Sequence, residues 1–393
     1  MGIEVDPHCF VEEPPNSRRG DRLPNKREHS PIRMRSTVLT NDTGRVTDSQ
    51  RGSLLSDIKY RWPTKYLASW IALGVLVVGV AIAAPTAFGG PSIRLVTALA
   101  GILLLASLGQ LLIVMVGAID LSVPSIVAVG AGVVVHYASP GTGSMIVTIV
   151  AALVITVAIS LANGFLISVL GLNALIVTIA TNGIIAGGIG LWTGVSFSVS
   201  GAAPESLQRF ADRAPLGISA CLIFAVVLAV VLSAVLRKTR AGRQVVSVGT
   251  NRRAAKMLGI KTHAVDLTTF AAAGLFYGAA GVMLAGFVGT PDATIGSPYQ
   301  LTTIIALAIA GATFAGGPAS VASLVAAAGF LELLDQALAI RGLSAGWRDV
   351  VQGSALVIAV SALTIARLSA SGTSRGLRFV RRPGARAGAA AHL

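Results

Sequence analysis

Residues 95–137 form one apolar stretch in which Asp120 is the only charged residue. The hydrocarbon core of a bilayer is ~30 Å thick, and ~20 helical residues cross it because each residue adds about 1.5 Å. The stretch is therefore too long for one membrane helix, and it has too few loop residues for three. We divide it near Asp120, which predicts spans at 95–118 and 121–137.

Similar apolar stretches recur along the chain. Only 12% of the residues are charged, about half the usual share of a soluble domain, and the mean hydropathy is +0.75. The fold class that we predict is an all-α polytopic membrane protein with about ten transmembrane helices, or eight if two of the segments are re-entrant. The spans are expected at about 67–84, 95–118, 121–137, 146–170, 174–194, 215–236, 264–288, 300–314, 319–340 and 347–368. The two segments that could be re-entrant are 174–194 and 300–314.

The net charge of +14 is concentrated outside these spans. Residues 1–65 contain 12 Lys and Arg, residues 237–261 contain eight, and residues 367–386 contain six. With ten spans, all three basic segments fall on one side of the membrane, as the positive-inside bias requires. The pattern therefore predicts that both termini are cytoplasmic, and it argues against nucleic-acid binding.

The composition predicts three parts of the chain. Residues 1–58 are polar and lack periodicity, which is typical of a disordered cytoplasmic tail. Residues 59–368 form the transmembrane domain, with a basic loop at 237–263, and residues 369–393 form a basic cytoplasmic tail. The segments 195–214 and 289–300 carry no positive bias and are expected outside, either as a docking surface or as simple connectors.

The chain shows no motif of an enzyme. It has no glycine-rich loop that ends in Gly-Lys-Ser/Thr, no HExxH zinc motif and no GxSxG nucleophile. The two cysteines, Cys9 and Cys221, lack metal-ligand spacing. The glycine-rich "GATFAGGPAS" at 311–320 is interpreted as a tight turn between two helices. We therefore predict no catalytic residues, no metal site and no cofactor in this chain.

Polar side chains inside the predicted spans are costly in a membrane and are therefore candidates for function. These residues are Asp120, Asn163, Asn182, Glu332, Asp335 and Gln336. Glu332 and Asp335 share one helical face near the predicted outer end of their span. We favour an interpretation in which they extend to the interface by snorkelling or pair with Arg341 there.

The segment "LANGFLISVLGLNALIVTIATN" (161–182) allows two interpretations. Its small and hydroxyl residues suit close helix packing, which we favour, but they could also line a polar path. In "GAIDLSVPS" (117–125), Asp120 or Ser122 can cap the helix that follows. Asp120 lies either in a cytoplasmic hairpin turn, which we slightly favour, or in a break inside the membrane that lines the path. The candidate path residues are Asp120, Ser122, Ser125, Asn163, Thr178, Thr181 and Asn182.

The basic loop contains a second candidate site. In "RKTRAGRQVVSVGTNRRAAKMLGIKTHAVD" (237–266), Asn251 can cap a helix of about two turns over 252–258, and Gly259 can end it. Because so short a helix is unstable alone, it must pack against something. Two interpretations remain open: a charged loop near anionic lipid, and a short helix that docks into a partner protein.

Four stretches, taken in order, resemble the permease subunits of bacterial ABC importers for monosaccharides of the ribose, xylose, arabinose and galactose type. They are "GQLLIVMVGAIDLSVPSIVAVGA" (109–131), "ANGFLISVLGLNALIVTIAT" (162–181), "TRAGRQVVSVGTNRRAAKMLGI" (239–260) and "AGATFAGGPASVASLVAAAGFLELLDQALAIRGLSAGWRDVVQGSALVIAV" (310–360). The resemblance implies a multi-pass permease of the cytoplasmic membrane, through which a monosaccharide passes by alternating access.

The same resemblance implies several partners. Cytoplasmic ABC ATPase subunits would hold ATP and magnesium, an extracytoplasmic binding protein would deliver the sugar, and a second permease, either an identical copy or a different one, would complete the path within membrane lipid. The coupling helix to the ATPase would comprise Asn251, Arg252, Arg253, Ala254, Ala255, Lys256, Met257, Leu258 and Gly259. Arg252 and Arg253 depart from the family, whose members usually carry acidic residues there, so this helix is expected to suit an acidic cleft.

Two other classes of protein are weaker fits. A secondary transporter driven by an ion gradient would favour buried acids at the midplane and an inverted repeat. Asp120 is the only acid that we place in a span before residue 205, and no repeat is evident in the sequence. A membrane-embedded enzyme would need a catalytic constellation, and none is visible.

Overall fold

The computed structural model describes residues 67–137, 142–193 and 201–370, and within these ranges the regular elements are all helices. The predicted tails, 1–58 and 369–393, lie outside the described residues except for the last two residues of α14. The α-helices are α2 (Ala68–Ala83), α3 (Gly90–Met115), α4 (Val123–Tyr137), α5 (Thr142–Ser168), α6 (Ala174–Thr193), α7 (Glu205–Asp212), α8 (Ala220–Lys238), α9 (Arg240–Thr250), α10 (Arg252–Met257), α11 (Thr262–Val288), α12 (Tyr299–Ile309), α13 (Val321–Ile340) and α14 (Ala345–Ala370). The short 3₁₀ turn η2 (Pro85–Phe88) joins α2 to α3, and a second one, η4 (Pro215–Gly217), precedes α8.

Each of the ten predicted spans contains one of these helices, so the all-α polytopic class is confirmed. In the described ranges, six helices are long and apolar enough to cross a membrane: α3, α5, α6, α8, α11 and α13. Three apolar helices, α2, α4 and α12, are shorter. At about 1.5 Å per residue, α12 reaches only ~16 Å, about half the thickness of a bilayer core, so it cannot cross alone.

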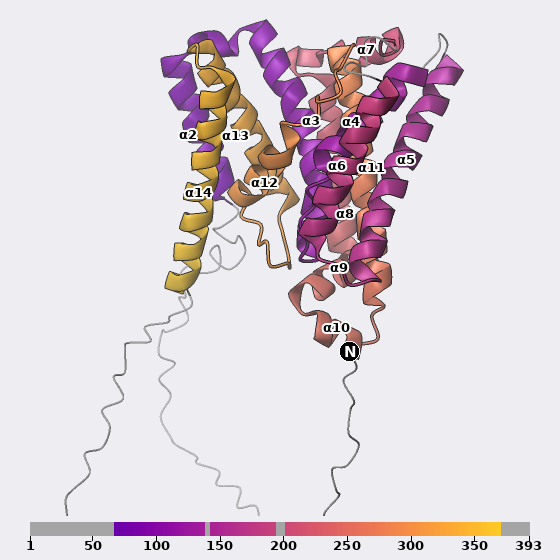
Figure 1. Ribbon diagram of the computed structural model, residues 1–393. Coiled ribbons are helices and arrows are strands. Elements are labelled where there is room, and N and C mark those ends of the chain that lie inside the picture. The colour runs from indigo at the N-terminus through magenta and orange to yellow at the C-terminus, as the bar shows by residue number, and fades with distance from the viewer. Residues whose placement is uncertain (1–66, 138–141, 194–200, 371–393) are drawn as a thin grey trace, which may run out of the picture. The chain divides into compact units, whose positions relative to one another are not determined.

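Helix α3 lies at the centre of the helical packing (Figure 1). From Ile102 to Met115 every side chain on it is buried, including the polar Ser107 and Gln110. A helix that is apolar on all sides is stable when other helices or lipid surround it, and the burial of these α3 side chains shows that other helices do so here. Helices α8, α11 and α13 do so, and α11 also packs along α4 and α5.

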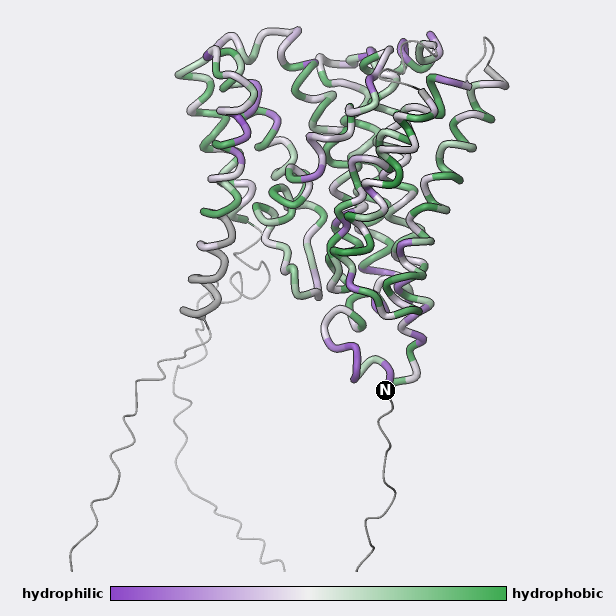
Figure 2. The backbone as a smooth tube through the Cα atoms, viewed as in Figure 1, coloured by the Kyte–Doolittle hydropathy of each residue, from purple (hydrophilic) through white to green (hydrophobic). Residues whose placement is uncertain are grey.

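The outer surfaces of α5, α6 and α8 are apolar and exposed. Val147 of α5, Ile176 of α6 and Val230 of α8 are each between 64% and 70% exposed. Figure 2 shows hydrophobic residues along these helices, with hydrophilic residues at the ends where α7 and α10 lie. Exposed apolar faces of this extent are typical of contact with lipid.

Small residues allow α5 to pack closely on α11. A Cβ atom at Gly274 of α11 would lie 2.7 Å from the Oγ of Ser160, and one at Gly164 of α5 would lie 2.8 Å from the Cβ of Phe270. Both distances are too short for real contacts, so only glycine fits at these two positions. Close helix packing, the interpretation that we favour for the segment 161–182, is thus present at Gly164.

The expected outer segments contain more structure than connectors would. Residues 205–212 of the first segment form α7, and the Ser219 side chain caps α8, which therefore begins five residues later than predicted. In the second segment, Gly296 is buried against the backbone of Pro124 at the start of α4. Part of 289–300 thus packs against α4, and its expected place on the outer side of the membrane stays a prediction.

The basic segment 237–263 is mostly helical and not a loop. Helix α9 begins after Thr239, whose hydroxyl accepts a hydrogen bond from the Gly242 amide. It buries Val245 and Val248 on one face and exposes basic residues on the other. The sequence analysis missed this helix because arginine and glycine residues obscure its short apolar face.

Candidate functional site

The chain breaks between α3 and α4, inside the most buried part of the bundle. The turn itself is at Gly117, which is exposed, whereas Asp120 is 1% exposed and Ser122 is fully buried. The favoured prediction of a hairpin turn at Asp120 is therefore corrected. The turn comes three residues earlier, and Asp120 lies in the segment that returns into the protein.

Asp120 organises the start of α4. Its Oδ1 accepts hydrogen bonds from the backbone amide of Ser122 at 2.8 Å and from the Ser122 hydroxyl at 2.5 Å. Near the first turn of a helix, a carboxylate also meets the positive end of the helix dipole. Both bonds go to Ser122, which directly precedes α4, so Asp120 orders the turn before the helix, and its predicted role as the helix cap stays a prediction.

Gln110 of α3 holds the backbone of Asp120 from the other side. With its amide oriented to satisfy both ends, Gln110 donates to the Asp120 carbonyl oxygen at 3.1 Å and accepts from the Asp120 amide at 3.2 Å. The same amide nitrogen lies 3.0 Å from the hydroxyl of Tyr277 on α11. In the apolar interior these bonds replace the hydrogen bonds that water would make with an irregular backbone.

A chain of side-chain hydrogen bonds runs from this break to α5 and α6. The Thr181 hydroxyl donates to Oδ1 of Asn163 at 2.6 Å, and Nδ2 of Asn163 donates to the Ser122 hydroxyl at 2.9 Å. The Ser122 hydroxyl in turn donates to Asp120. All three donors point the same way, so each bond polarises the next. We call Asp120, Ser122, Asn163 and Thr181 the polar chain.

The other candidate path residues do not join the polar chain directly. The Ser125 hydroxyl donates to the Ser122 carbonyl oxygen, and the Thr178 hydroxyl donates to the Ala174 carbonyl oxygen within α6. Asn182 lies half-buried on α6, and no hydrogen bond joins it to any residue that the structure describes. Their place in a translocation path remains a prediction.

One acceptor in this region is unsatisfied. Oδ2 of Asp120 is buried, and among the described residues it has no hydrogen-bond partner. Nor do the buried residues of the described ranges include a lysine or an arginine. The interior therefore offers hydroxyl groups, amide groups and one carboxylate oxygen, without a compensating cation.

The predicted coupling helix forms as α10. The Asn251 side chain accepts from the Ala254 amide at 3.0 Å and caps the helix, and the Gly259 amide donates to the Lys256 carbonyl oxygen. Gly259 has φ +77°, a left-handed conformation that favours glycine at the end of a helix. The predicted start after Asn251 is confirmed, and the helix ends at Met257, one residue earlier than predicted.

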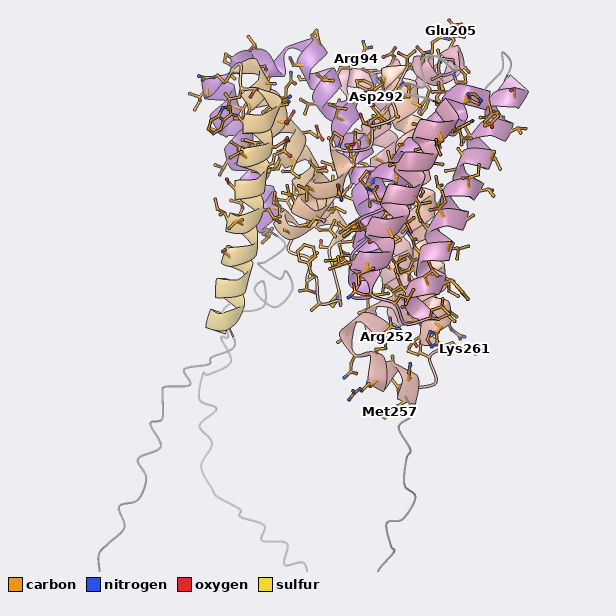
Figure 3. The ribbon with its side chains drawn as sticks, in the orientation of Figure 1. Arg94, Glu205, Arg252, Met257, Lys261 and Asp292 are labelled. Carbon is orange, nitrogen blue, oxygen red and sulfur yellow. The ribbon has the colours of Figure 1, made fainter. Side chains whose placement is uncertain are left out.

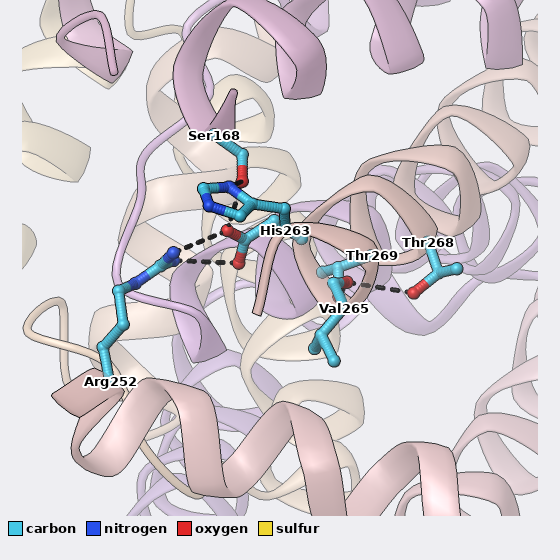
Figure 4. A network of polar contacts seen from close by, with 7 residues as sticks. Ser168, Arg252, His263, Val265, Thr268 and Thr269 are labelled. Carbon is cyan, nitrogen blue, oxygen red and sulfur yellow. Dashed lines mark hydrogen bonds and ion pairs between the residues drawn. The ribbon is translucent and has the colours of Figure 1, made fainter. Parts of the chain in front are cut away.

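Helix α10 is anchored on one side and free on the other. Ala255 is 2% exposed and belongs to the main hydrophobic core. Met257 and Leu258 are 84% and 78% exposed, and Figure 3 shows Met257 at the extreme end of the described residues. Arg252 faces inward, where it pairs with Asp266 of α11 (Figure 4).

Three distant segments meet beside α10 through their backbones. A Cβ atom on Gly249 of α9 would lie 1.7 Å from the Met115 carbonyl oxygen at the end of α3. That oxygen also accepts from the Gly317 amide at 3.0 Å. The predicted tight turn at 311–320 is therefore present, and in addition it joins α3 to α9.

The acids of α13 pair differently from the prediction. Asp335 accepts hydrogen bonds from Arg348 and from Gln352, both on α14, the second at 3.0 Å. Arg341 donates instead to the Ala83 carbonyl oxygen at the end of α2. The predicted pairing of Asp335 with Arg341 is wrong, because Arg341 follows the end of α13 and turns toward α2.

Four important polar residues were missed at the sequence level: Gln110, Ser168, Asp266 and Tyr277. Gln110 is the only amide in the apolar run before Asp120, and this isolation could have marked it. Asp266 lies just after the predicted start of its span, beside basic residues, where it resembles an ordinary interfacial acid. No local pattern identifies Ser168 as the partner of Asp266, and none identifies Tyr277 as the partner of Gln110.

A protein-family model described as "Branched-chain amino acid transport system / permease component" matches residues 92–360, about two thirds of the chain. The match includes the polar chain, Gln110, Tyr277 and all of α10.

Several named proteins are similar over more than two thirds of the chain. The "Autoinducer 2 import system permease protein LsrC" of Escherichia coli (strain K12 / DH10B) is 29% identical over 266 residues, which cover 68% of this chain and 77% of the relative. The protein of the same name from Salmonella typhimurium is 29% identical over 266 residues, which cover 68% of this chain and 76% of the relative. The "Probable ABC transporter permease protein y4mJ" of Sinorhizobium fredii is 29% identical over 298 residues, 75% of this chain and 87% of the relative. No solved structure matches the chain.

Proposed function

The chain belongs to the family of branched-chain amino acid transport system permease components, and from this premise we propose how it works and what it carries. It is a multi-pass permease subunit of an ABC importer in the cytoplasmic membrane of a bacterium, and ATP hydrolysis belongs to separate ATPase subunits. We propose that its substrate is a monosaccharide or a close hydroxylated relative, which an extracytoplasmic binding protein delivers.

The chemistry of the polar chain supports this substrate class. Ser122, Asn163 and Thr181 offer neutral hydroxyl and amide groups, which suit the hydroxyl groups of a sugar. An amino acid would bring a carboxylate, which requires a cation or an open helix N-terminus. Here the start of α4 is already occupied by Asp120, whose carboxylate would repel another. The absence of an interior Lys or Arg among the described buried residues favours a neutral solute.

We propose alternating access as the transport mechanism. In this mechanism the end of the bundle that carries α10 faces the cytoplasm, and the end that carries α7 faces the binding protein. The positive-inside bias of the sequence predicts that both chain termini are cytoplasmic as well. Weak contacts along the path let the solute leave after each cycle, because a path that binds strongly releases slowly. Tight recognition of the sugar then belongs to the binding protein.

The proposed assembly contains two permease subunits, the second being a copy of this chain. Each permease presents α10 to one ATPase subunit, and the apolar faces of α5, α6 and α8 contact lipid where they are not covered by the second permease. ATP and magnesium bind to the ATPase subunits.

Reconstitution tests the function directly. The permease is co-purified with the ATPase encoded beside it and inserted into vesicles, and uptake of ribose, xylose, arabinose, galactose and leucine is measured with the binding protein present. Uptake of one sugar that requires ATP and survives an ionophore supports the proposal. Uptake that persists without ATP but collapses with the ion gradient contradicts it, and selective uptake of leucine contradicts the substrate class.

The coupling role of α10 is tested separately. Gly259→Trp places a large side chain in a left-handed backbone conformation, and Ala254→Glu adds an acid to a half-buried position on α10. We expect both variants to insert and fold but to lose ATP-driven uptake. Full activity in both would show that α10 does not couple the permease to the ATPase.

A further inference from the structure

Asp266 is a buried carboxylate at the base of α11. Its side chain is only 3% exposed, whereas the side chain of its partner Arg252 is 41% exposed. The two groups form a bidentate pair: Nη1 of Arg252 donates to Oδ2 at 2.7 Å and Nη2 donates to Oδ1 at 2.9 Å. A planar fork of this kind fixes orientation as well as distance.

The same carboxylate also holds the end of α5. The hydroxyl of Ser168, the last residue of α5, donates to Oδ2 of Asp266 at 2.6 Å, and it lies 3.1 Å from Nδ1 of His263 at the exposed edge of the cluster (Figure 4). One side chain of α11 thus joins α10 to α5. We call Arg252, Asp266 and Ser168 the α10 joint.

Three helices meet at the joint: α5, α10 and α11. Two of them, α5 and α11, also hold the break between α3 and α4. Asn163 lies five residues before Ser168 on α5, about 7.5 Å along the helix. Tyr277, which contacts Gln110, lies on α11. A displacement of α10 therefore has a short path, through two rigid helices, to the polar chain.

The side chains on the outward surface of α10 are more exposed than Arg252, and no described hydrogen bond or ion pair joins them to α11. Arg253 and Lys256 are exposed, and no ion pair holds either of them in the described part of the chain. Met257 and Leu258 project beside them, far more exposed than a soluble surface normally leaves such side chains. The outward surface of α10 is thus an apolar tip with two flanking cations.

We propose that the two sides of α10 have separate tasks, an inference that rests on the proposed coupling function. The apolar tip, Met257 and Leu258, enters a cleft of the ATPase that has an apolar floor and an acidic rim, which faces Arg253 and Lys256. Arg252 does not contact the ATPase. Together with Asp266 and Ser168 it is a positioning residue that transfers the movement of α10 to α5 and α11.

The test uses the full importer complex with four sets of variants. Arg252→Ala and Asp266→Ala break the α10 joint, and Arg252→Asp with Asp266→Arg reverses the ion pair. The matched control is Arg240→Ala, at an exposed arginine of α9 that forms no ion pair with any described residue. Met257→Asp with Leu258→Asp disrupts the apolar tip. For each set, three quantities are measured: co-purification of the ATPase, basal ATP hydrolysis and ATP-driven uptake of the transported sugar.

Variants that break the α10 joint should lose transport while the permease and the ATPase stay assembled. We expect Arg252→Ala and Asp266→Ala to retain the ATPase and its basal hydrolysis but to lower uptake about tenfold or more, a typical size for coupling between sites. The reversed pair should recover much of that loss, and Arg240→Ala should have only a small effect on uptake. Disruption of the apolar tip should give the opposite pattern, with loss of ATPase co-purification from a folded permease.

Three results would overturn the proposal. The first is loss of ATPase co-purification in Arg252→Ala as complete as in the tip variant. The second is unchanged uptake in both single joint variants. The third is a reversed pair that folds normally, as judged by its unfolding temperature, yet transports no better than the single variants. Absence of ATP-driven uptake in the unmodified complex would instead contradict the proposed function, whatever the joint variants do.

Discussion

The two polar clusters of this permease differ in charge and in burial. The polar chain lies deep in the bundle and uses neutral hydroxyl and amide groups around a single acid, with bonds of 2.5–2.9 Å. The α10 joint lies at the end of the bundle, and its bidentate ion pair has one buried partner and one that is partly exposed to solvent. Both clusters nevertheless connect α5 to other segments.

The difference follows from the cost of burying charge. An ion pair deep in an apolar interior must repay the desolvation of both ions, whereas a guanidinium at the edge stays partly hydrated. Neutral hydrogen bonds satisfy the polar chain without that cost. They can also be exchanged for bonds to a passing solute, whereas a bidentate ion pair is better suited to hold a fixed geometry.

Asn163→Leu should have the largest effect, because Asn163 bonds to both neighbours in the polar chain. The substitution leaves the hydroxyls of Ser122 and Thr181 with one partner fewer in a buried site, and each lost partner costs ~1–3 kcal/mol. We expect a loss of several degrees in the unfolding temperature and strongly reduced uptake. The matched control is Asn182→Leu, on the neighbouring helix, which breaks no described hydrogen bond and should change the unfolding temperature little.

Asp120→Ala comes next, because it removes the acceptor at the start of α4. Without this acceptor the buried Ser122 amide has one partner fewer, which costs ~1–3 kcal/mol, and uptake should fall as the break loses its geometry. Asp120→Asn keeps one acceptor oxygen for the Ser122 amide and should recover part of the stability. If the alanine variant folds and transports normally, Asp120 has no role in the path.

Tyr277→Phe should have a smaller effect. It removes one hydrogen bond, to Gln110, while the two bonds from Gln110 to the backbone of Asp120 remain. We expect a loss of ~1 kcal/mol in the free energy of unfolding and a modest loss of uptake. A larger loss than in Asp120→Ala would show that α11, and not α4, controls the break.

Arg94→Ala should have the smallest effect. Arg94 pairs with Asp212 at the α7 end, where the two side chains are 47% and 55% exposed. Exposed ion pairs contribute about 0–1 kcal/mol, so the unfolding temperature should barely change. Reduced delivery of sugar by the binding protein in this variant, at unchanged stability, would identify Arg94 as part of the docking surface.

Much of the fold could be predicted from the sequence, because helices in a membrane must satisfy their backbone internally and therefore appear as long apolar runs. All ten predicted spans contain a helix. The ends of α10 were also predictable, because Asn251 and Gly259 carry local capping signals. Helix α9 could not be predicted in this way, because only its packing against the bundle reveals which of its residues are buried.

The partners of the polar residues were less predictable than the residues themselves. Asp120, Ser122, Asn163 and Thr181 were all expected to matter, yet no local pattern indicates that they form one chain. Asp335 pairs with Arg348 and not with the nearer Arg341, because the turn after α13 directs Arg341 toward α2. Such pairings depend on how helices are placed in three dimensions, which sequence spacing does not encode.

The contacts around the break also imply an order in which the protein is built. Gln110 and Asp120 are close in the chain, and Ser122 and Asn163 are separated by 41 residues, so these contacts can form while synthesis is still at an early stage. Tyr277 is 167 residues from Gln110 and reaches the membrane much later. A nascent chain thus carries a provisional break that the arrival of α11 completes. Chains that stop before α11 should retain an incompletely satisfied break, a defect that cellular quality control could recognise.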